Sequence, residues 1–310
     1  MDPIKTINID KDTTFVLMLE SQSRGHEVWY LEMKDLFVQH GKPFASVTEI
    51  RLKRAEEYFQ LGRTETVPLD SFNIVWMRKD PPFNMDYIYS TYILGLIDTE
   101  RTVVINNPKG IRESNEKLYT LNFPDLIPES FVTKDIDKLR VFLREIGGEM
   151  VVKPLDGCGG EGIFYVREGD RNANVVMETI TDHGNRYVLA QKFIDKVSEG
   201  DKRIILLDGE PLGAVLRVAR GGGEFRCNFH SGGSPAKTEL DERDLQICRE
   251  IRPRLRTDGL YLVGIDVIGG YLTEVNTTSP TGVQEINRLS GTKLEAQVTD
   301  FVEKMCETKF

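Results

Sequence analysis

The chain has 310 residues, 40% of them hydrophobic, which is enough to build the cores of two or three domains. Its formal net charge of −9 and its pI near 5.2 would repel a phosphate backbone, so nucleic acid is not an expected partner. No apolar run approaches the roughly 18 residues of a membrane span, and residues 1–12 lack the apolar core of a signal peptide. We therefore expect a cytosolic protein without a membrane partner.

The chain lacks the usual motifs of zinc enzymes and serine hydrolases. Its four cysteines, Cys158, Cys227, Cys248 and Cys306, lie far apart and form no C-x-x-C pair, which predicts free thiols. The four histidines form no metal-spaced cluster, and there is no G-x-S-x-G motif. Both enzyme classes are therefore disfavoured.

The first predicted elements are a helix and a strand. Asp12 can cap a helix that runs to about Arg24, and residues 28–31 then resemble a strand. A helix that leads into a strand in this way normally follows an earlier parallel strand, because the helix of a crossover unit connects two parallel strands. Residues 1–11 are too short and too polar to be that strand. We therefore expect that the first strand of this domain is missing from the sequence.

Further strands and helices complete residues 1–112. They are a hairpin over 36–53 that turns at Gly41-Lys42, a strand over 73–77, a helix over 85–99 and a strand over 102–106, followed by a linker at 107–110. Arg78 and Lys79 directly follow the strand over 73–77, and ligands of open α/β sheets gather at such strand ends. These side chains either bind a carboxylate or phosphate or form a solvated basic turn.

A glycine-rich loop over 156–162 lies between two predicted strands. The helix after the linker carries Lys117, and Lys153 ends the strand before the loop. Backbone amides of such a loop can approach phosphate oxygens because no side chain intervenes. The loop is neither a P-loop nor a dinucleotide fingerprint, since no G-K-[ST] follows and the next element is a strand. It is either a flap over a nucleotide or a plain turn.

The following segment offers groups that suit a nucleotide. Residues 187–194 form a strand whose backbone could pair with an adenine edge, and Asp201-Lys202-Arg203 could contact ribose and phosphate. The alternative is a buried strand with a charged turn. A hairpin over 201–218 leads to a glycine-rich loop over 220–234, a candidate lid with Arg226 as its anion contact. Two helices are expected, over 238–256 and 293–304.

Residues 263–276 are predicted to form a hairpin that turns at Gly269-Gly270. A two-residue turn would place Asp266 and Glu274 on opposite faces of the sheet. A three-residue turn that includes Tyr271 pairs apolar residues with one another and sets Asp266 directly across from Glu274. We therefore expect the three-residue turn.

The two acids of this hairpin predict a cation. Two carboxylates about 5 Å apart repel by roughly 3 kcal/mol at an effective dielectric near 20, and Asn276 follows one step along the same face. Oxygen ligands without His or Cys suit Mg²⁺ or Mn²⁺, which usually accompany nucleotide phosphates. The alternative is an ordinary solvated hairpin.

Taken together, these segments resemble the prokaryotic glutathione synthetases of the ATP-grasp superfamily. The similar runs are MRKDPPFNMDYIYSTYILG (77–95), NEKLYTLNFPDLIPESFVT (115–133), KPLDGCGG (153–160), GDKRI (200–204) and TEVNTTSPTG (273–282). The resemblance implies an α/β (α+β) ATP-grasp fold with an N-terminal Rossmann-like pre-grasp domain that lacks its first strand. The implied domains are a pre-grasp domain (1–112), a lid subdomain with the flap (113–190) and a C-terminal subdomain with the metal site and substrate loop (191–310).

The resemblance also implies roles for individual residues. The implied ATP-binding residues are Lys117, Lys153, Gly157, Gly159, Gly160, Gln191, Lys192, Phe193, Ile194 and Asp201. The implied ligands of two Mg²⁺ or Mn²⁺ ions are Asp266, Glu274 and Asn276. The implied catalytic residues are Arg203 and Arg226, and the implied substrate contacts are Arg78, Ser279 and Thr281.

The implied reaction is the ATP-dependent ligation of γ-glutamylcysteine with glycine through an acyl phosphate. Such chemistry needs charge neutralisation and exclusion of water but no protein nucleophile. The alternatives are a related carboxylate-amine ligase with another acceptor and a scaffold that binds ATP without using it. The resemblance further implies small-molecule substrates and a homodimer or homotetramer.

Overall fold

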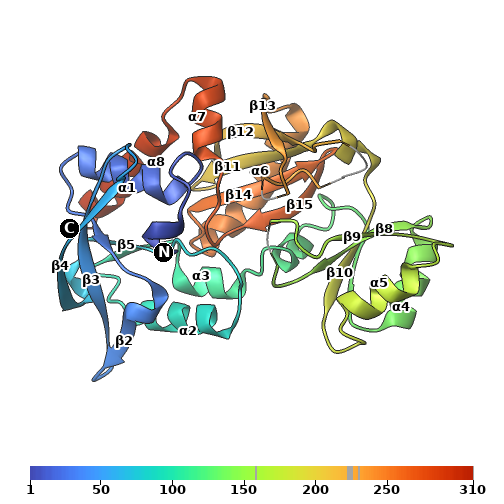
Figure 1. Cartoon of the computed structure of the whole chain (residues 1–310), viewed down its shortest axis with the longest axis horizontal. Coiled ribbons are helices and arrows are strands. Elements are labelled where there is room, and N and C mark those ends of the chain that lie inside the picture. The colour runs from blue at the N-terminus through green and yellow to red at the C-terminus, as the bar shows by residue number, and fades with distance from the viewer. Residues whose placement is uncertain (158, 222–225, 230, 310) are drawn as a thin grey trace.

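The structure is a computed structural model that describes residues 1–157, 159–221, 226–229 and 231–309. Figure 1 shows the N-terminal region at the left, a large sheet in the centre and a smaller lobe at the right. In the described part of the chain, no helix combines the length and the apolar character that crossing a membrane requires.

Residues 1–112 contain two small sheets. The antiparallel sheet has the order β1-β3-β2 with β4 also paired to β3, and its strands are β1 (Trp29–Tyr30), β2 (Leu36–Gln39), β3 (Lys42–Leu52) and β4 (Phe59–Pro68). The second sheet pairs β5 (Ile74–Trp76) with β6 (Val103–Ile105) in parallel. The helices are α1 (Thr13–Ser23), α2 (Met85–Leu94) and α3 (Pro108–Glu113). The parallel part of this region therefore consists of two strands among the described residues.

Several local predictions for this region needed correction. The predicted cap is present, because Asp12 Oδ1 accepts a hydrogen bond from Phe15 N at 2.6 Å. The first hairpin turns at His40-Gly41, one residue earlier than predicted, and both residues have positive φ. Residues 107–110 begin α3 instead of a linker, since Asn107 caps the helix and Pro108 fits its first turn. The sequence did not predict β4, which is mostly exposed and carries little apolar alternation.

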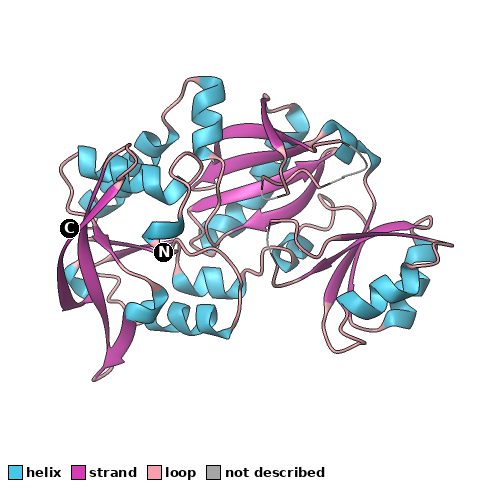
Figure 2. Cartoon of the chain, in the orientation of Figure 1, coloured by secondary structure: helices cyan, strands magenta, loops and turns pink. Residues whose placement is uncertain are grey.

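The lobe at the right of Figure 1 contains a four-stranded sheet of order β7-β10-β8-β9. Its strands are β7 (Ser130–Thr133), β8 (Glu149–Pro154), β9 (Phe164–Arg167) and β10 (Val188–Lys192). The helices α4 (Ile136–Glu145) and α5 (Ala173–Ile180) lie on one side of this sheet (Figure 2) and bury Leu139 and Met177 with Met150. Because β8 pairs with β9 in an antiparallel ladder, the predicted strand–loop–strand arrangement is confirmed.

The central sheet has five antiparallel strands in the order β13-β12-β11-β14-β15. They are β11 (Asp201–Leu207), β12 (Glu210–Val218), β13 (Ser234–Lys237), β14 (Leu262–Ile268) and β15 (Tyr271–Asn276). The helices that follow the hairpins are α6 (Glu242–Thr257), α7 (Val283–Ser290) and α8 (Leu294–Glu307). The start predicted for α6 at residue 238 is wrong, because Asp241 and Asp244 form a capping box there.

Short 3₁₀ helices fill several connections. They are η1 (Ile4–Thr6), η2 (Met33–Asp35), η3 (Leu69–Ser71), η4 (Leu118–Asn122) and η5 (Asp195–Glu199). Lys117 therefore lies in the connection between α3 and η4. The prediction that Lys117 belongs to a helix is wrong.

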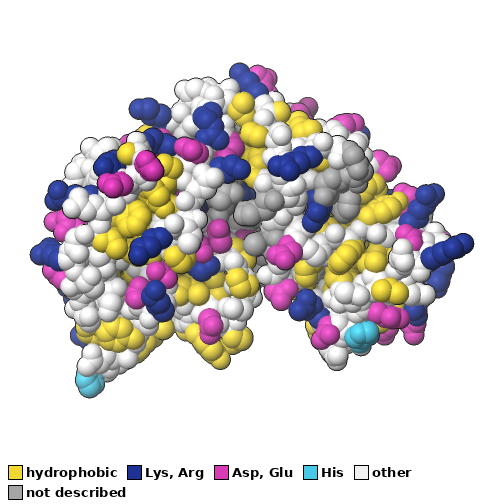
Figure 3. All heavy atoms as spheres, viewed as in Figure 1, with side chains coloured by type: hydrophobic (Ala, Val, Ile, Leu, Met, Phe, Trp, Pro, Cys, Tyr) yellow, Lys and Arg dark blue, Asp and Glu magenta, His cyan; other side chains and the backbone are white. Residues whose placement is uncertain are grey.

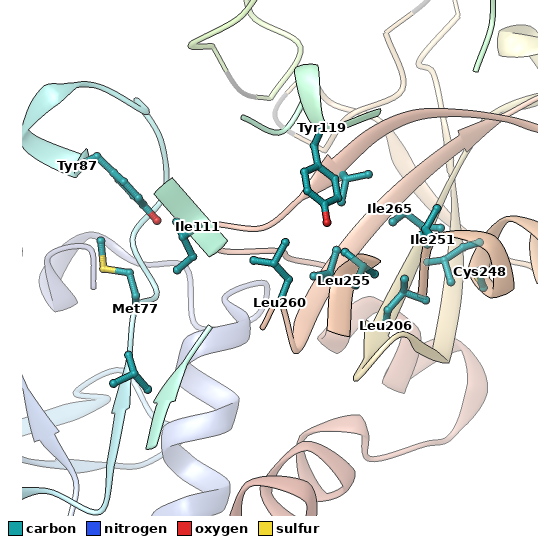
Figure 4. Packing of buried hydrophobic residues seen from close by; sticks show 14 of the residues in the cluster. Met77, Tyr87, Ile111, Tyr119, Leu206, Cys248, Ile251, Leu255, Leu260 and Ile265 are labelled. Carbon is teal, nitrogen blue, oxygen red and sulfur yellow. The ribbon is translucent and has the colours of Figure 1, made fainter. Parts of the chain in front are cut away.

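A continuous hydrophobic core joins the N-terminal region to the central sheet (Figure 4). It runs through Met77, Tyr87, Ile111, Tyr119, Leu260, Leu255, Ile251, Cys248, Leu206 and Ile265. The last helix packs back on the N-terminal region, since Val302 is buried beside Val103 and Ile105. Arg24 adds ion pairs to Asp300 (2.6 Å) and Glu303 (2.7 Å) of the same helix. The two ends of the chain are thereby held together.

Candidate active site

The hairpin of β14 and β15 sets Asp266 directly across from Glu274. The route to this register differs from the prediction, because the turn contains two residues, Gly269 and Gly270, both with positive φ. The extra residue is Thr273, which bulges between the pairs on either side and donates its hydroxyl to the carbonyl oxygen of Asp266 at 3.1 Å. The predicted three-residue turn is wrong, whereas the predicted pairing of the acids is confirmed.

Asp266 is buried and held by two arginines. Arg203 of β11 donates through Nε and Nη2 to the two carboxylate oxygens, the latter at 3.1 Å, and Arg217 Nη2 lies 2.8 Å from Oδ2. Burial alone would raise the pKa of Asp266, but the two guanidinium groups outweigh it and hold the pKa well below its usual range. This acid is therefore ionised in the folded protein.

Glu274 is neutralised by a different cation. Lys117 Nζ lies 3.0 Å from Glu274 Oε1 and donates to the carbonyl oxygen of Gly157 at 2.6 Å. Asn276, one step along β15, donates its side-chain amide to the carbonyl oxygen of Gly264 at 3.1 Å. Each acid of the hairpin thus has its own basic partner, Lys117 for Glu274 and Arg203 for Asp266.

Lys153 reaches the same region from β8. Its Nζ donates to Gln191 Oε1 at 2.8 Å, and Gln191 in turn donates to Ser130 Oγ at 2.9 Å. Desolvation within the pocket lowers the pKa of Lys153 despite the attraction of Glu274. The side chain of Gln191 thus orients Lys153, while Lys192 points to the surface and pairs with Glu129 at 3.0 Å.

These side chains surround a pocket of about 820 Å³, including space that is open to solvent. The predicted site residues that line it are Lys117, Lys153, Gly157, Gly159, Gly160, Gln191, Lys192, Phe193, Ile194, Asp201, Arg226, Asp266 and Glu274. The predicted residues outside the lining are Arg78, Arg203, Asn276, Ser279 and Thr281. The pocket therefore lies between the two sheets, with the acids on one wall and the lysines on another.

Two loops meet over this pocket. Arg226 Nη1 donates to the carbonyl oxygen of Gly160 at 3.3 Å, and Ser231 Oγ donates to that of Gly159 at 3.2 Å. A side chain at Gly160 would lie 2.9 Å from Asn228 Nδ2, so the close approach requires glycine. Cys158 of the flap and residues 222–225 and 230 of the candidate lid lie outside the described residues.

The predicted substrate residues form a second cluster beside the pocket. Arg78 is buried, and its Nη2 donates to the carbonyl oxygen of Pro280 at 3.0 Å. Arg203 Nη1 donates to the next carbonyl, that of Thr281, at 3.1 Å. The loop that carries Ser279 is therefore held by one arginine from the N-terminal region and one from the central sheet.

Two buried side chains of the site escaped the sequence analysis. Glu116 Oε1 accepts hydrogen bonds from Thr277 N (3.0 Å), Thr278 N (3.1 Å) and Thr278 Oγ1 (2.8 Å), which fixes the start of the loop that carries Ser279. Arg217 lies between Asp201 and Asp266 and donates to both. An arginine within the largely apolar strand β12 was the available signal for Arg217, since buried charges are rarely tolerated without partners.

The donor chemistry of the site fits a divalent cation. Two facing carboxylates and a nearby amide offer the oxygen ligands that Mg²⁺ and Mn²⁺ prefer. Within the described ranges, no three His, Cys, Asp or Glu side chains cluster as a metal site, so the acids would share a metal with other oxygen donors.

On the face drawn in Figure 3, basic and acidic side chains are interspersed and neither sign dominates.

Comparison with known proteins identifies the family. The chain matches the models for the prokaryotic glutathione synthetase N-terminal domain (residues 1–112) and ATP-grasp domain (residues 116–291). It is 48% identical over 308 residues to a glutathione synthetase of Thermosynechococcus vestitus, with 96% of each chain covered. It is 42% identical over 310 residues to one of Vibrio vulnificus, covering 100% of this chain and 97% of the relative.

Solved structures agree on the fold. The ATP-grasp ligase PsnB, complexed with a minimal precursor, superposes with a TM-score of 0.62 at 16% identity and covers 93% of this chain and 94% of its own. A RimK domain ATP-grasp protein of Sphaerobacter thermophilus gives 0.60 at 17% identity over 96% of each chain. The expected ATP-grasp fold is confirmed, and the protein is an ATP-dependent ligase. By its sequence and its fold, the chain belongs to the prokaryotic glutathione synthetase family.

Proposed function

We propose that this protein joins γ-L-glutamyl-L-cysteine to glycine with cleavage of ATP to ADP and phosphate, and so forms glutathione. The similarity of the whole chain to glutathione synthetases supports this reaction. In the structure, the observation that carries it is the convergence of two lysines and two acids in one pocket beneath two glycine-containing loops.

In this proposal the pocket binds ATP. Lys117 and Lys153 contact the phosphates, and the glycines of the flap, Gly157, Gly159 and Gly160, cover them with backbone amides. The adenine lies against residues 191–194, and Asp201 contacts the ribose. Lys117 and Lys153 are suitable because both side chains line the pocket and both ammonium groups already donate hydrogen bonds to oxygen atoms there.

Asp266, Glu274 and Asn276 would hold two Mg²⁺ or Mn²⁺ ions. Such ions, when bound, neutralise phosphate charge during phosphoryl transfer. The chain contributes to the same task through Lys117, which neutralises Glu274 in the structure and can turn to a phosphate once a metal takes its place.

The cluster beside the pocket would bind the peptide substrates. Arg78, Ser279 and Thr281 contact γ-glutamylcysteine or glycine, and Arg203 and Arg226 act at the reacting phosphate. The substrate carboxylate attacks the γ-phosphate of ATP and displaces ADP, and the amine of glycine then displaces phosphate from the acyl phosphate. The contact between Arg226 and Gly160 supports a role for the two loops in excluding water.

The proposal includes a homodimer or homotetramer in the cytosol, with small molecules as its substrates. Its test is the release of ADP with γ-glutamylcysteine, measured with and without glycine. Release that requires both substrates is the expected result. If no ADP is released, whether glycine is present or absent, the protein is an ATP-binding scaffold. If ADP is released only with acceptors other than glycine, it is a related carboxylate-amine ligase.

A further inference from the structure

Two consecutive buried residues, Glu116 and Lys117, contact different parts of the site. The carboxyl group of Glu116 accepts hydrogen bonds from the loop over residues 277–282, which connects β15 to α7. The ammonium group of Lys117 pairs with Glu274 and donates to the flap at Gly157. This dipeptide thus touches both the loop that the proposed function assigns to the peptide substrates and the pocket that it assigns to ATP.

The side chain of Glu116 holds the first two residues of the loop. One oxygen, Oε1, accepts from Thr277 N at 3.0 Å, from Thr278 N at 3.1 Å and from Thr278 Oγ1 at 2.8 Å. Both threonines are buried, with exposed fractions of 0% and 3%, so water cannot easily replace these bonds. The start of the loop is therefore fixed relative to Glu116.

The backbone of Glu116 is fixed to the central sheet. Its carbonyl oxygen accepts a hydrogen bond from Val275 N at 3.0 Å. Val275 lies between Glu274 and Asn276 on β15, which stands at the end of the strand order of this sheet. The bond therefore continues the ladder beyond the strand that carries two of the proposed metal ligands, and Glu116 cannot move independently of that strand.

The same loop is also tied to the N-terminal region. Asn106 Nδ2 donates to the carbonyl oxygen of Thr277 at 3.1 Å, and Arg78 Nη2 donates to that of Pro280 at 3.0 Å. A peptide substrate that shifted this loop would also pull on the dipeptide, because one carboxyl oxygen of the dipeptide bonds the start of the loop. The dipeptide in turn carries a lysine of the nucleotide pocket.

We propose that Glu116 is a positioning residue that couples binding of the peptide substrate at the 277–282 loop to binding of ATP at Lys117. The proposal rests on the proposed function, which assigns the loop and the lysine to these ligands. Each ligand would order the side of the dipeptide that it meets and so leave less to be ordered by the other. The two ligands should therefore bind with positive cooperativity, and the factor should be the same in both directions.

The coupling is measured as a ratio of two affinities in the full-length protein. In the presence of Mg²⁺, calorimetric titration gives the Kd of the β,γ-imido analogue of ATP, alone and with saturating γ-glutamylcysteine. In the original protein, γ-glutamylcysteine should tighten binding of the analogue roughly fivefold or more. The reverse titration, of γ-glutamylcysteine with and without the analogue, should give the same factor.

Two substitutions break the contact between Glu116 and the loop. Glu116→Ala removes all three hydrogen bonds and should bring the coupling factor to about one. Because this variant leaves buried amides unpaired and can unfold, Thr278→Val provides a second measurement. Valine keeps the size of the side chain but loses the hydroxyl bond to Glu116, so the factor should fall at least about twofold, while the Kd of the analogue alone changes less than that.

Two further variants separate positioning from a general loss of stability. Thr278→Ser keeps the hydroxyl and should restore the coupling factor. Thr299→Val is the matched control, because Thr299 is also buried and its hydroxyl bonds the carbonyl oxygen of Glu295 at 2.9 Å within α8, away from the site. This variant should lose stability as Thr278→Val does but keep the full coupling factor.

The proposal is overturned if the two ligands bind the original protein independently, or if a folded Glu116→Ala or Thr278→Val variant keeps the full factor. An equal loss of coupling in Thr299→Val would also contradict it. If γ-glutamylcysteine does not bind the original protein at all, the proposed function fails and the coupling fails with it. Independent binding of both ligands refutes the coupling alone, so the two failures are distinguishable.

Discussion

Lys117 forms an ion pair with Glu274, with 3.0 Å between Nζ and Oε1, and the same ammonium donates to the carbonyl oxygen of Gly157. One side chain therefore connects an acid of the β14–β15 hairpin to the glycine flap. In the proposed reaction, the nucleotide would compete with Glu274 and Gly157 for Lys117, and a metal would compete with Lys117 for Glu274. Lys117 would therefore couple metal binding at Glu274 to the position of the flap.

Replacing Lys117 by Met tests this coupling. Methionine keeps the length of the side chain but removes its charge. Because a hydrogen bond to a charged group is worth about 1.5–3 kcal/mol, KM for ATP should rise roughly 10- to 100-fold. Lys138→Met is the matched control, since Lys138 lies outside the pocket lining and its exposed side chain pairs with Asp135 at 3.8 Å. Equal effects of the two substitutions in steady-state kinetics would argue against a phosphate contact for Lys117.

Glu274→Gln tests the metal role of the hairpin. The amide has the shape of the carboxylate but lacks its charge, so the variant should lose affinity for Mg²⁺ and turn over at least about 100-fold more slowly. Thermal unfolding should change little, because the side chain is partly exposed and Lys117 keeps its bond to Gly157. Glu129→Gln, at an exposed ion pair, serves as the control. If Glu274→Gln and the original protein have the same turnover number at the same Mg²⁺ concentration, Glu274 is not a metal ligand.

The pH dependence of stability should report on Asp201. Desolvation raises the pKa of Asp201 from 3.8 to about 6, although Arg217 opposes the shift. The folded protein therefore binds this proton more tightly than the unfolded chain does. The stabilisation that the proton provides is complete below pH 3.8 and is lost as the pH rises through 6.

Asp201→Asn should remove this dependence, since an amide does not titrate in this range. The free energy of unfolding of the original protein, relative to the variant, should fall between pH 4 and pH 7 by at most about 3 kcal/mol. Denaturant titrations at several pH values measure it. Asp137→Asn, at a side chain that is 87% exposed, should show no comparable trend. A constant difference between Asp201→Asn and the original protein would contradict the raised pKa.

A methyl group at Gly160 should disturb the contact between the two loops. Gly160 and Gly169 have similar positive φ angles, 82° and 81°, so alanine at either should cost about 1–2 kcal/mol of stability. Only at Gly160 does the added Cβ meet neighbours, Asn228 Nδ2 at 2.9 Å and Ser231 Oγ at 3.0 Å. Gly160→Ala should therefore raise KM for ATP several-fold, whereas Gly169→Ala should leave it unchanged. Kinetics that do not distinguish the two variants would exclude a role for the contact.

The predictions from the sequence were best where the signal was local. The cap at Asp12, the strands on either side of the flap and the hairpin β11–β12 follow from caps, glycine punctuation and apolar runs. The linker placed at 107–110 failed because Asn107-Pro108 can also begin a helix, and only packing of Ile111 into the core decides between the two. The exposed strand β4 gave almost no apolar pattern to detect.

By itself the sequence determined the family, the kinds of side chain in the pocket and the fact that Asp266 and Glu274 share a hairpin. Tertiary structure decided how these acids come to face one another, through a bulge at Thr273 instead of a longer turn, because apolar burial constrains the register and leaves open where the extra residue goes. Tertiary structure also brought the basic partners of the two acids into contact with them. Arg217 comes from another strand of the central sheet and Lys117 from a connection more than 150 residues away in sequence, and charges so distant along the chain meet only when the sheets pack.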